Sequence, residues 1–439
     1  MPPYPDKLPD GGSDPNVIEK TYTIDVITPL FGGGYEAGTV DPDMPIRASS
    51  IRGHLRFWWR ATRGARYDNV KELRQREGEI WGSMENPSPV IVEADIQSCG
   101  KAYPCAYYPE GSNSPQFKVN HPPYALFPFQ GSRRQDIPAT KCIAGISFRL
   151  TISYPKELSL EVGAALWAWV NFGGIGARTR RGCGALYCQD LSPPDRAGIG
   201  EWYRQCLKES GIVPSPPREW PTLPDKILIK DGNGVDALQC WSDVIELLQT
   251  FRQGKDVGRN SRRDSPRLGR SRWPEPDSIR RIVLMQKYLD NPPGDWNWHL
   301  PDDRISDISF PRAEFGMPII FEIRGEGIKP SLQPGKDKDR MASPVILKPM
   351  KLQNQQCASM ILRLTARKVD SAYLKPRDRP DRRDLTTGRS ITASEIANPQ
   401  NNVDFAASPL NKYCNTGSAL DAFLAYAKDP LQGFTEVPR

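Results

Sequence analysis

The sequence predicts an α+β fold, and three stretches in the first half of the chain support this. Residues 21–30 (TYTIDVITPL) alternate polar and apolar side chains, as a half-buried strand does. Residues 44–63 repeat apolar side chains at helical spacing. Residues 158–172 contain ALWAWVNF and are apolar nearly all round, which is typical of a buried helix. Strands and helices therefore alternate.

The order of these elements predicts the type of the first domain. Further strands are expected at 89–95, 143–154 and 184–191. Together with the two helices they give strand–helix–strand–strand–helix–strand, the ferredoxin-like (RRM-like) pattern. A long insertion rich in Pro, Tyr and Phe, which includes residues 117–130, separates the second and third strands.

Proline content and charge suggest the domain boundaries. We expect a disordered tail at 1–19, a first domain at 20–191, a proline-rich linker at 192–224 and a second α+β domain at 225–439. The second domain should contain a basic segment, 252–273, with eight Lys or Arg against two Asp, and a polar loop, 366–412. Its order of strands cannot be read; the expected elements are a strand near Ile227, helices at 241–251 and 420–427, and strands at 317–323 and 360–364.

The composition limits the classes of partner and the cellular compartment that can be expected. The net charge of +7 and the pI near 8.8 permit an anionic partner without requiring one. Nine cysteines without a disulfide-framework spacing indicate a reducing compartment. The polar, proline-rich start is unlike a secretory signal, and the sequence has no apolar run of about 18 residues. We therefore expect a cytoplasmic protein without a membrane partner.

The segment 44–63 (MPIRASSIRGHLRFWWRATR) has five arginines and no acidic residue. Ser49 and Ser50 are expected to cap its helix. Helical periodicity gathers Ile51, Leu55, Trp58, Trp59 and Thr62 on one side, and arginines on the neighbouring side. A row of guanidinium groups suits phosphates, because each offers a planar, permanently charged fork of donors. The alternative is an ordinary solvated face, although such faces usually mix both signs of charge.

A second informative stretch, residues 171–184 (NFGGIGARTRRGCG), combines five glycines with three arginines. Glycines let backbone N–H groups approach an anion closely. The stretch has neither the Gly-Lys-Ser/Thr of a nucleotide loop nor the spacing of a dinucleotide fingerprint, so no cofactor is expected. A tight helix-to-strand turn would explain the glycines but not the arginines.

Catalytic and metal-binding signals are weak. His54 lies near the edge of the apolar helix face, where packing is a commoner role than base catalysis. Asp41 and Asp43 form a DPD that usually just makes a turn. No cysteine pair has the CxxC spacing of a zinc site. We therefore predict no catalytic residue, no metal and no small-molecule substrate.

These motifs together resemble a known family. The loop FGGGYEAG at 31–38, the helix RASSIRGHLRFWWR and the loop NFGGIGARTRRGCGAL are similar to the RAMP superfamily of CRISPR proteins. Within that superfamily they resemble the first subunits of type III-B (Cmr) effector complexes. GRSRWPEPDSIR at 269–280, AEFGMPIIF at 313–321 and RMASPVILKP at 340–349 extend the resemblance to about residues 20–365.

The resemblance implies two ferredoxin-like domains with long loop insertions, and a role in antiviral defence. It implies a subunit at the end of an RNA-guided ribonucleoprotein that holds the 3′ part of the guide RNA. Such a subunit packs against RAMP backbone subunits and contacts guide RNA (crRNA) or target RNA. Target cleavage belongs to the backbone subunits, so Asp41 and Asp43 are not expected to be catalytic and the chain is not expected to be an enzyme.

The resulting hypothesis is a phosphate-binding groove that joins the arginine helix and the glycine-rich loop. Tyr35, Phe127 and Phe129 are expected to stack on bases. Two alternatives remain: a metal-independent endoribonuclease that uses His54 on precursor guide RNA, with a metal-dependent nuclease at Asp41 and Asp43 as a weaker variant, and a pure scaffold. The expected RNA-binding residues are Arg47, Ser49, Ser50, Arg52, Arg56, Arg60, Arg63, Gly173, Gly174, Gly176, Arg178, Arg180 and Arg181.

Overall fold

The computed structural model describes most of the chain. The described residues are 15–34, 39–213, 215–232, 234, 236–260, 271–279, 281–282, 308–322, 329–375, 389–397, 408–414 and 416–438. The expected tail, apart from residues 15–19, and Tyr35 of the first loop lie outside this part, as do residues 261–270 of the basic segment. Among the described residues, no helix has both the length and the apolarity needed to cross a membrane.

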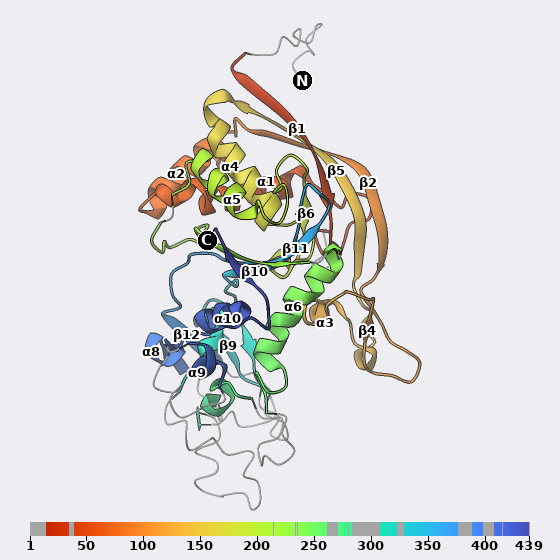
Figure 1. Cartoon of the computed structure of the whole chain (residues 1–439), viewed down its shortest axis with the longest axis vertical. Coiled ribbons are helices and arrows are strands. Elements are labelled where there is room, and N and C mark those ends of the chain that lie inside the picture. The colour runs from red at the N-terminus through yellow and green to blue at the C-terminus, as the bar shows by residue number, and fades with distance from the viewer. Residues whose placement is uncertain are drawn as a thin grey trace, which may run out of the picture.

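The first four-stranded sheet is antiparallel, with the strand order β2–β5–β1–β6. It follows the predicted order of elements, and its helices cover one face of the sheet (Figure 1). We call this unit the first module. Its strands are β1 (Val17–Val26), β2 (Ile91–Pro104), β5 (Lys141–Pro155) and β6 (Leu186–Tyr187), and its helices are α1 (Ala48–Ala61), α2 (Val70–Trp81) and α4 (Ser159–Phe172).

Helix α1 confirms the predicted apolar face and corrects the predicted cap. The five apolar-side positions, Ile51 to Thr62, are at most 3% exposed. The helix begins one residue before Ser49, after Arg47 in an extended conformation, and no side chain caps it. Ser49 and Ser50 therefore lie inside the first turn, exposed to solvent, and the predicted serine cap is wrong.

The insertion lies at the end of a long hairpin. Strands β2 and β5 pair over nearly their whole length, and β3 (Ala106–Tyr107), β4 (Gln116–Phe117) and α3 (Pro123–Leu126) follow at the tip. There α3 contacts α6 (Ala237–Gln253) of the second half of the chain, as Figure 1 shows. The insertion thus joins the two halves.

The second four-stranded sheet has the order β10–β11–β7–β14, also antiparallel. In chain order its elements run strand–helix–strand–strand–helix–strand, so both sheets share one topology. The structure thus gives the strand order of the second domain, which could not be read from the sequence. We call this unit the second module; its elements are β7 (Ile227–Asp231), α6, β10 (Val345–Lys351), β11 (Cys357–Arg363), α10 (Ala419–Lys428) and β14 (Thr435–Val437).

A third sheet, with the order β13–β12–β9–β8, is formed by segments around β10 and β11. It corrects the prediction that 366–412 is only a loop, because β12 and β13 pair within that range. The strand expected at 317–323 is only two residues long. The elements are β8 (Ile319–Ile320), β9 (Ser331–Gln333), β12 (Ser371–Lys375) and β13 (Arg389–Thr392), with helices α8 (Ala393–Ile396) and α9 (Pro409–Tyr413) and the short helix η6 (Pro311–Phe315) nearby.

The segment expected to be a linker carries a helix, α5 (Ile199–Glu209). Its Ile199 and Tyr203 are fully buried in a core that contains residues of both modules, including Trp58 and Met360. The two sheets therefore share one hydrophobic core, and residues 192–224 are part of it. The prolines indicate irregular backbone in this segment, whereas the helical spacing of apolar residues in α5 is typical of a helix with one buried face.

Candidate nucleic-acid interface

Two arginines of α1 share one carboxylate from α2. Arg56 Nε lies 2.7 Å from Glu77 Oε1, and Arg60 Nη1 lies 2.6 Å from the same oxygen. The Glu77 side chain is only 7% exposed, whereas the arginine side chains are 37% and 32% exposed. One buried negative charge thus orients two partly exposed positive charges, which leaves one net positive charge at the surface.

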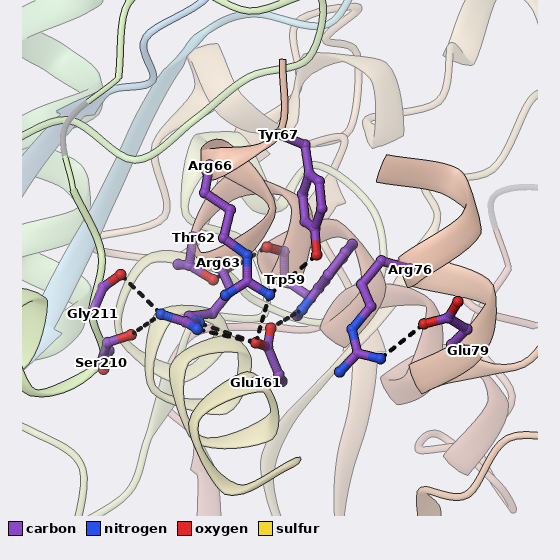
Figure 2. A network of polar contacts seen from close by, with 10 residues as sticks. All are labelled: Trp59, Thr62, Arg63, Arg66, Tyr67, Arg76, Glu79, Glu161, Ser210 and Gly211. Atoms are coloured by element: carbon purple, nitrogen blue, oxygen red, sulfur yellow. Dashed lines mark hydrogen bonds and ion pairs between the residues drawn. The ribbon is translucent and has the colours of Figure 1, made fainter. Parts of the chain in front are cut away.

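Arg63 belongs to an interior network, which Figure 2 shows. Glu161 of α4 accepts bonds from Trp59 Nε1 at 2.6 Å, from Arg63 Nη2 at 3.1 Å and from Arg66 Nη2 at 3.0 Å. Arg63 Nη1 also donates to the carbonyl oxygens of Ser210 and Gly211, at the end of α5. Arg63 therefore fastens α1 to α4 and α5.

The N-terminal arginines of α1 have no such carboxylate. Arg52 donates to the carbonyl oxygen of Val90 at 3.2 Å. Within the described residues the side chain of Arg47 makes neither a hydrogen bond nor an ion pair. Ser49 and Ser50 lie exposed beside them. The beginning of α1 thus presents positive charge and hydroxyl groups without internal neutralisation.

The glycine-rich loop, residues 173–184, is held against the loop that follows β1. Ala177 N donates to Phe31 O at 2.6 Å, and Gly184 N donates to Pro29 O at 3.0 Å. Gly176 has φ +84°, and a Cβ there would lie 2.5 Å from Phe31 O, so only glycine fits. The amides of Gly173 and Ile175 are bonded to Trp169 O and Gly184 O. These two amides are therefore not free to bind a ligand, contrary to the expectation for this stretch.

The three arginines of the loop have different surroundings. Arg180 donates to Ser343 O, and its guanidinium lies 5.5 Å from the ring centre of Phe57 on α1. Arg181 Nη1 donates to Val345 O at 2.9 Å, which binds the loop to β10. The side chain of Arg178, a residue with φ +57°, makes no hydrogen bond or ion pair within the described part of the chain, and its Nε is buried. Burial lowers the pKa of all three guanidinium groups.

The fold brings the arginine helix and the glycine-rich loop together. Helices α1 and α4 pack on each other, and the loop begins where α4 ends. A Cβ at Gly173 would lie 2.5 Å from Trp58 Nε1, so glycine permits this close approach. The two stretches that the sequence singled out are therefore neighbours, about 120 residues apart in the chain.

The other candidate residues have structural surroundings. His54 stacks on Trp169 with ring centres 6.1 Å apart, and burial lowers its pKa. Asp41 Oδ1 accepts from the amides of Asp43 and Met44, which makes a turn. In the described ranges no three His, Cys, Asp or Glu side chains gather as a metal site. Phe129 is buried and stacks on Phe31, so its expected base contact is wrong, whereas Phe127 is 61% exposed.

Sequence reasoning missed two features of this region. Lys348 of β10 is 1% exposed and donates to Val170 O at 3.2 Å and to Gly173 O at 3.0 Å, at the end of α4. Its signal was a lone lysine in the apolar run VILKPM. Arg252, at the end of α6, lies near Tyr124 of α3, with 6.0 Å from its guanidinium to the ring centre. No local pattern in the sequence links these two residues.

Comparison with known proteins finds similarity to one family, and the family match covers the first module. Residues 23–187 match the model of the RAMP superfamily. The Cmr subunit Cmr1-2 of the CRISPR system of Pyrococcus furiosus is 29% identical over 191 residues, which cover 40% of this chain and 97% of that protein. Cmr1-1 of the same organism is 27% identical over 143 residues, which cover 32% of this chain and 40% of that protein.

Among solved structures, the crystal structure of Cmr1 from Pyrococcus furiosus in its apo form matches with a TM-score of 0.48 and 16% identity. The match covers 86% of this chain and 94% of that one. A type III-B Cmr-beta chain, solved with cognate target RNA, matches with a TM-score of 0.42 and 12% identity over 80% of this chain and 94% of that one. Residues 23–187 thus match the RAMP superfamily, and the chain is similar to Cmr1 subunits over part of its length.

Proposed function

We propose that this chain is a non-catalytic, RNA-binding subunit of a type III-B CRISPR effector complex. The complex-level role rests on the similarity to Cmr1 subunits and on the RAMP-superfamily match. The RNA-binding role rests on one observation, the adjacency of the α1 arginines to the glycine-rich loop. In this proposal the subunit binds the 3′ part of the guide RNA, the target RNA or both, at one end of the complex, beside other RAMP subunits.

The distribution of charge favours one part of the predicted groove. Arg47 and Arg52 have no carboxylate partner in the described structure, and Arg56 and Arg60 share one carboxylate. Phosphate contacts give affinity without sequence preference, which suits a guide whose spacer varies. We assign Arg47, Ser49, Ser50, Arg52, Arg56 and Arg60 to one side of the groove, and Arg178 and Arg180 to the other side. We omit Arg63, because its guanidinium group already bonds to Glu161 and to two backbone carbonyl oxygens.

The test is RNA binding by the purified full chain over a series of salt concentrations. The Arg52→Ala/Arg56→Ala/Arg60→Ala variant should bind RNA more weakly, and its salt slope should fall by about two to three, because each lost phosphate contact releases about one counterion fewer. Arg149→Ala/Arg133→Ala/Arg204→Ala, which removes three arginines outside the groove, is the charge-matched control. Equal affinity and an equal salt slope for the groove variant and wild type would contradict the groove.

The non-catalytic part of the proposal has a separate test. His54 is stacked on Trp169, and its lowered pKa keeps the imidazole neutral near pH 7. We expect precursor RNA to stay intact when it is incubated with the chain in chelator, and also with added Mg²⁺ or Mn²⁺. Cleavage in chelator that His54→Ala abolishes would replace the proposal with an endoribonuclease.

A further inference from the structure

A buried lysine of the second module reaches the end of helix α4, where the glycine-rich loop begins. Lys348 lies in the middle of β10, and its Nζ donates to Val170 O at 3.2 Å and to Gly173 O at 3.0 Å. Val170 lies in the last turn of α4, where carbonyl oxygens have no partner within the helix. A positive charge at this end of a helix is also favoured by the helix dipole. Lys348 thus caps a helix of the first module from a strand of the second module.

The stability of β10 does not account for this lysine. Lys348 is 1% exposed, and in the described part of the chain no carboxylate lies within ion-pair distance of its Nζ. A buried cation without a counter-charge costs folding free energy, which an apolar residue of similar length, such as methionine, does not. The lysine instead provides donors for two carbonyl oxygens, which an apolar residue cannot provide.

The carbonyl groups that Lys348 binds lie where the loop meets the arginine helix. A Cβ at Gly173 would lie 2.5 Å from Trp58 Nε1 of α1, so the backbone of Gly173 is in close contact with α1. The Gly173 amide donates to Trp169 O at 2.9 Å, and Trp169 Nε1 donates to Gly174 O at 3.0 Å. A movement of Gly173 would therefore change how the loop lies against α1.

The same strand also binds the loop further along. Arg181 Nη1 donates to Val345 O of β10 at 2.9 Å, and Arg180 donates to Ser343 O just before the strand. Arg178 lies between these contacts and the contact of Lys348, and its side chain bonds to no described group. The second module therefore holds the loop on both sides of the arginine that is available to a ligand.

We propose that Lys348 is a positioning residue for the RNA groove: from β10, its amino group holds the end of α4 and the start of the glycine-rich loop in place against α1. Lys348 does not contact RNA, because it is buried. Its effect on RNA rests on the proposed function; the positioning of the loop does not. The second module thereby contributes to RNA affinity through a segment of the first module.

Hydrogen exchange of the full chain, read by mass spectrometry, tests the positioning without RNA. In Lys348→Met, the peptides that contain the bonded amides of Gly173, Ile175 and Ala177 should exchange about tenfold faster than in wild type. Met350→Leu replaces another buried side chain of β10, an apolar one, with a similar volume. It is the control and should leave the loop at the wild-type rate. Unchanged exchange of the loop in Lys348→Met would overturn the proposal.

Urea unfolding separates a positioning role from a merely structural one. Lys348→Met should keep a free energy of unfolding close to that of wild type at pH 7, because removal of a buried charge offsets the loss of two hydrogen bonds. Lower stability with faster exchange throughout the chain would overturn the proposal, since the lysine would then support the whole core. If Lys348→Met does not fold, Lys348→Gln, which keeps an N–H donor without the charge, carries the same comparison with a smaller increase in exchange.

RNA binding at a fixed salt concentration links the loop to the groove. Lys348→Met should bind RNA about tenfold more weakly than wild type. Adding Arg178→Ala to Lys348→Met should cost less affinity than Arg178→Ala costs in wild type, because both changes act through the same loop. Wild-type affinity in Lys348→Met, despite faster exchange of the loop, would overturn its role in the groove. Absence of RNA binding by wild type would instead contradict the proposed function, and the exchange measurement would still decide whether Lys348 positions the loop.

Discussion

The arginines of α1 and those of the glycine-rich loop differ in what neutralises them. Glu77 is the ion-pair partner of Arg56 and Arg60 on α1, and Glu161 is the partner of Arg63 and Arg66 in the short helix η1 (Arg63–Arg66) that follows α1. In the loop, the side chains of Arg180 and Arg181 bond only to carbonyl oxygens, and the side chain of Arg178 bonds to no described group. The same residue type in two neighbouring segments thus has two kinds of surroundings: arginines paired with carboxylates connect helices, and we propose that those without a carboxylate partner bind the ligand.

This difference shows that not every arginine in a row along a sequence is available to bind a ligand. Arg63 lies on the predicted arginine face, yet its side chain is 12% exposed and holds two helices together. Its carboxylate partner, Glu161, is about a hundred residues away and no local pattern relates the two. The predictions below test this division, from the largest expected effect to the smallest.

Glu161→Gln should destabilise the protein most. The carboxylate is 6% exposed and accepts from Trp59, Arg63 and Arg66, so its loss leaves buried positive charge unpaired. We expect the free energy of unfolding in urea to fall by about 3 kcal/mol or more. Glu79→Gln, which removes an exposed carboxylate paired with Arg76, should cost at most about 1 kcal/mol. Equal costs would contradict a structural role for Arg63.

Lys348 extends the comparison to a buried cation that has only carbonyl oxygens as partners. Burial lowers its pKa from 10.5 to about 7. Between these values the unfolded state holds the proton and the folded state does not, so stability rises with pH in this window. Relative to Lys348→Met, wild type should gain up to about 2 kcal/mol between about pH 7 and 8.5 in urea unfolding. A constant difference would show that Lys348 does not titrate there.

Glu77→Gln should reduce stability while strengthening RNA binding. Its arginine partners are about one-third exposed, so water screens part of the lost attraction, and we expect about 1–2 kcal/mol in urea unfolding. The net positive charge at α1 rises by one, so the salt slope of RNA affinity should become steeper by about one. Weaker RNA binding by a folded Glu77→Gln variant would show that Arg56 and Arg60 need Glu77 for their orientation.

Ser49→Ala and Ser50→Ala should have the smallest effect on stability. Neither side chain caps α1, so each change should stay within about 0.5 kcal/mol. Asn69 caps α2 by accepting from Glu72 N at 2.9 Å, and Asn69→Ala should cost about 1 kcal/mol in the same measurement. A cost for either serine as large as that for Asn69 would restore the predicted cap.

Local patterns predicted much of this fold. The alternation in β1 and the helical spacing in α1 and α4 are properties of single segments, and the structure confirms these elements. The order of the second sheet was not predictable, because insertions separate its helices from its strands and β11 and β14 both pair with the distant strand β7. The burial of Tyr203 in a proline-rich stretch likewise depends on contacts with Trp167 and Phe172 of α4.

The candidate site, like the fold, was predictable only in part. Residue type and spacing indicated the arginine helix and the glycine-rich loop, and the fold places them side by side. The buried carboxylates that occupy Arg56, Arg60 and Arg63 come from other helices, so the sequence could not show which arginines stay free. Arg252 was recognised only as part of a basic segment; its position against Tyr124 depends on the packing of α3 on α6.

The central claim is that RNA lies between the arginine helix and the glycine-rich loop. Photo-crosslinking of the full chain to RNA carrying 4-thiouridine, followed by mass spectrometry of the crosslinked peptides, tests it directly. We predict crosslinks in both residues 44–62 and residues 173–184, and their loss in the Arg52→Ala/Arg56→Ala/Arg60→Ala variant. Crosslinks confined to other segments, unchanged in that variant, would contradict the claim.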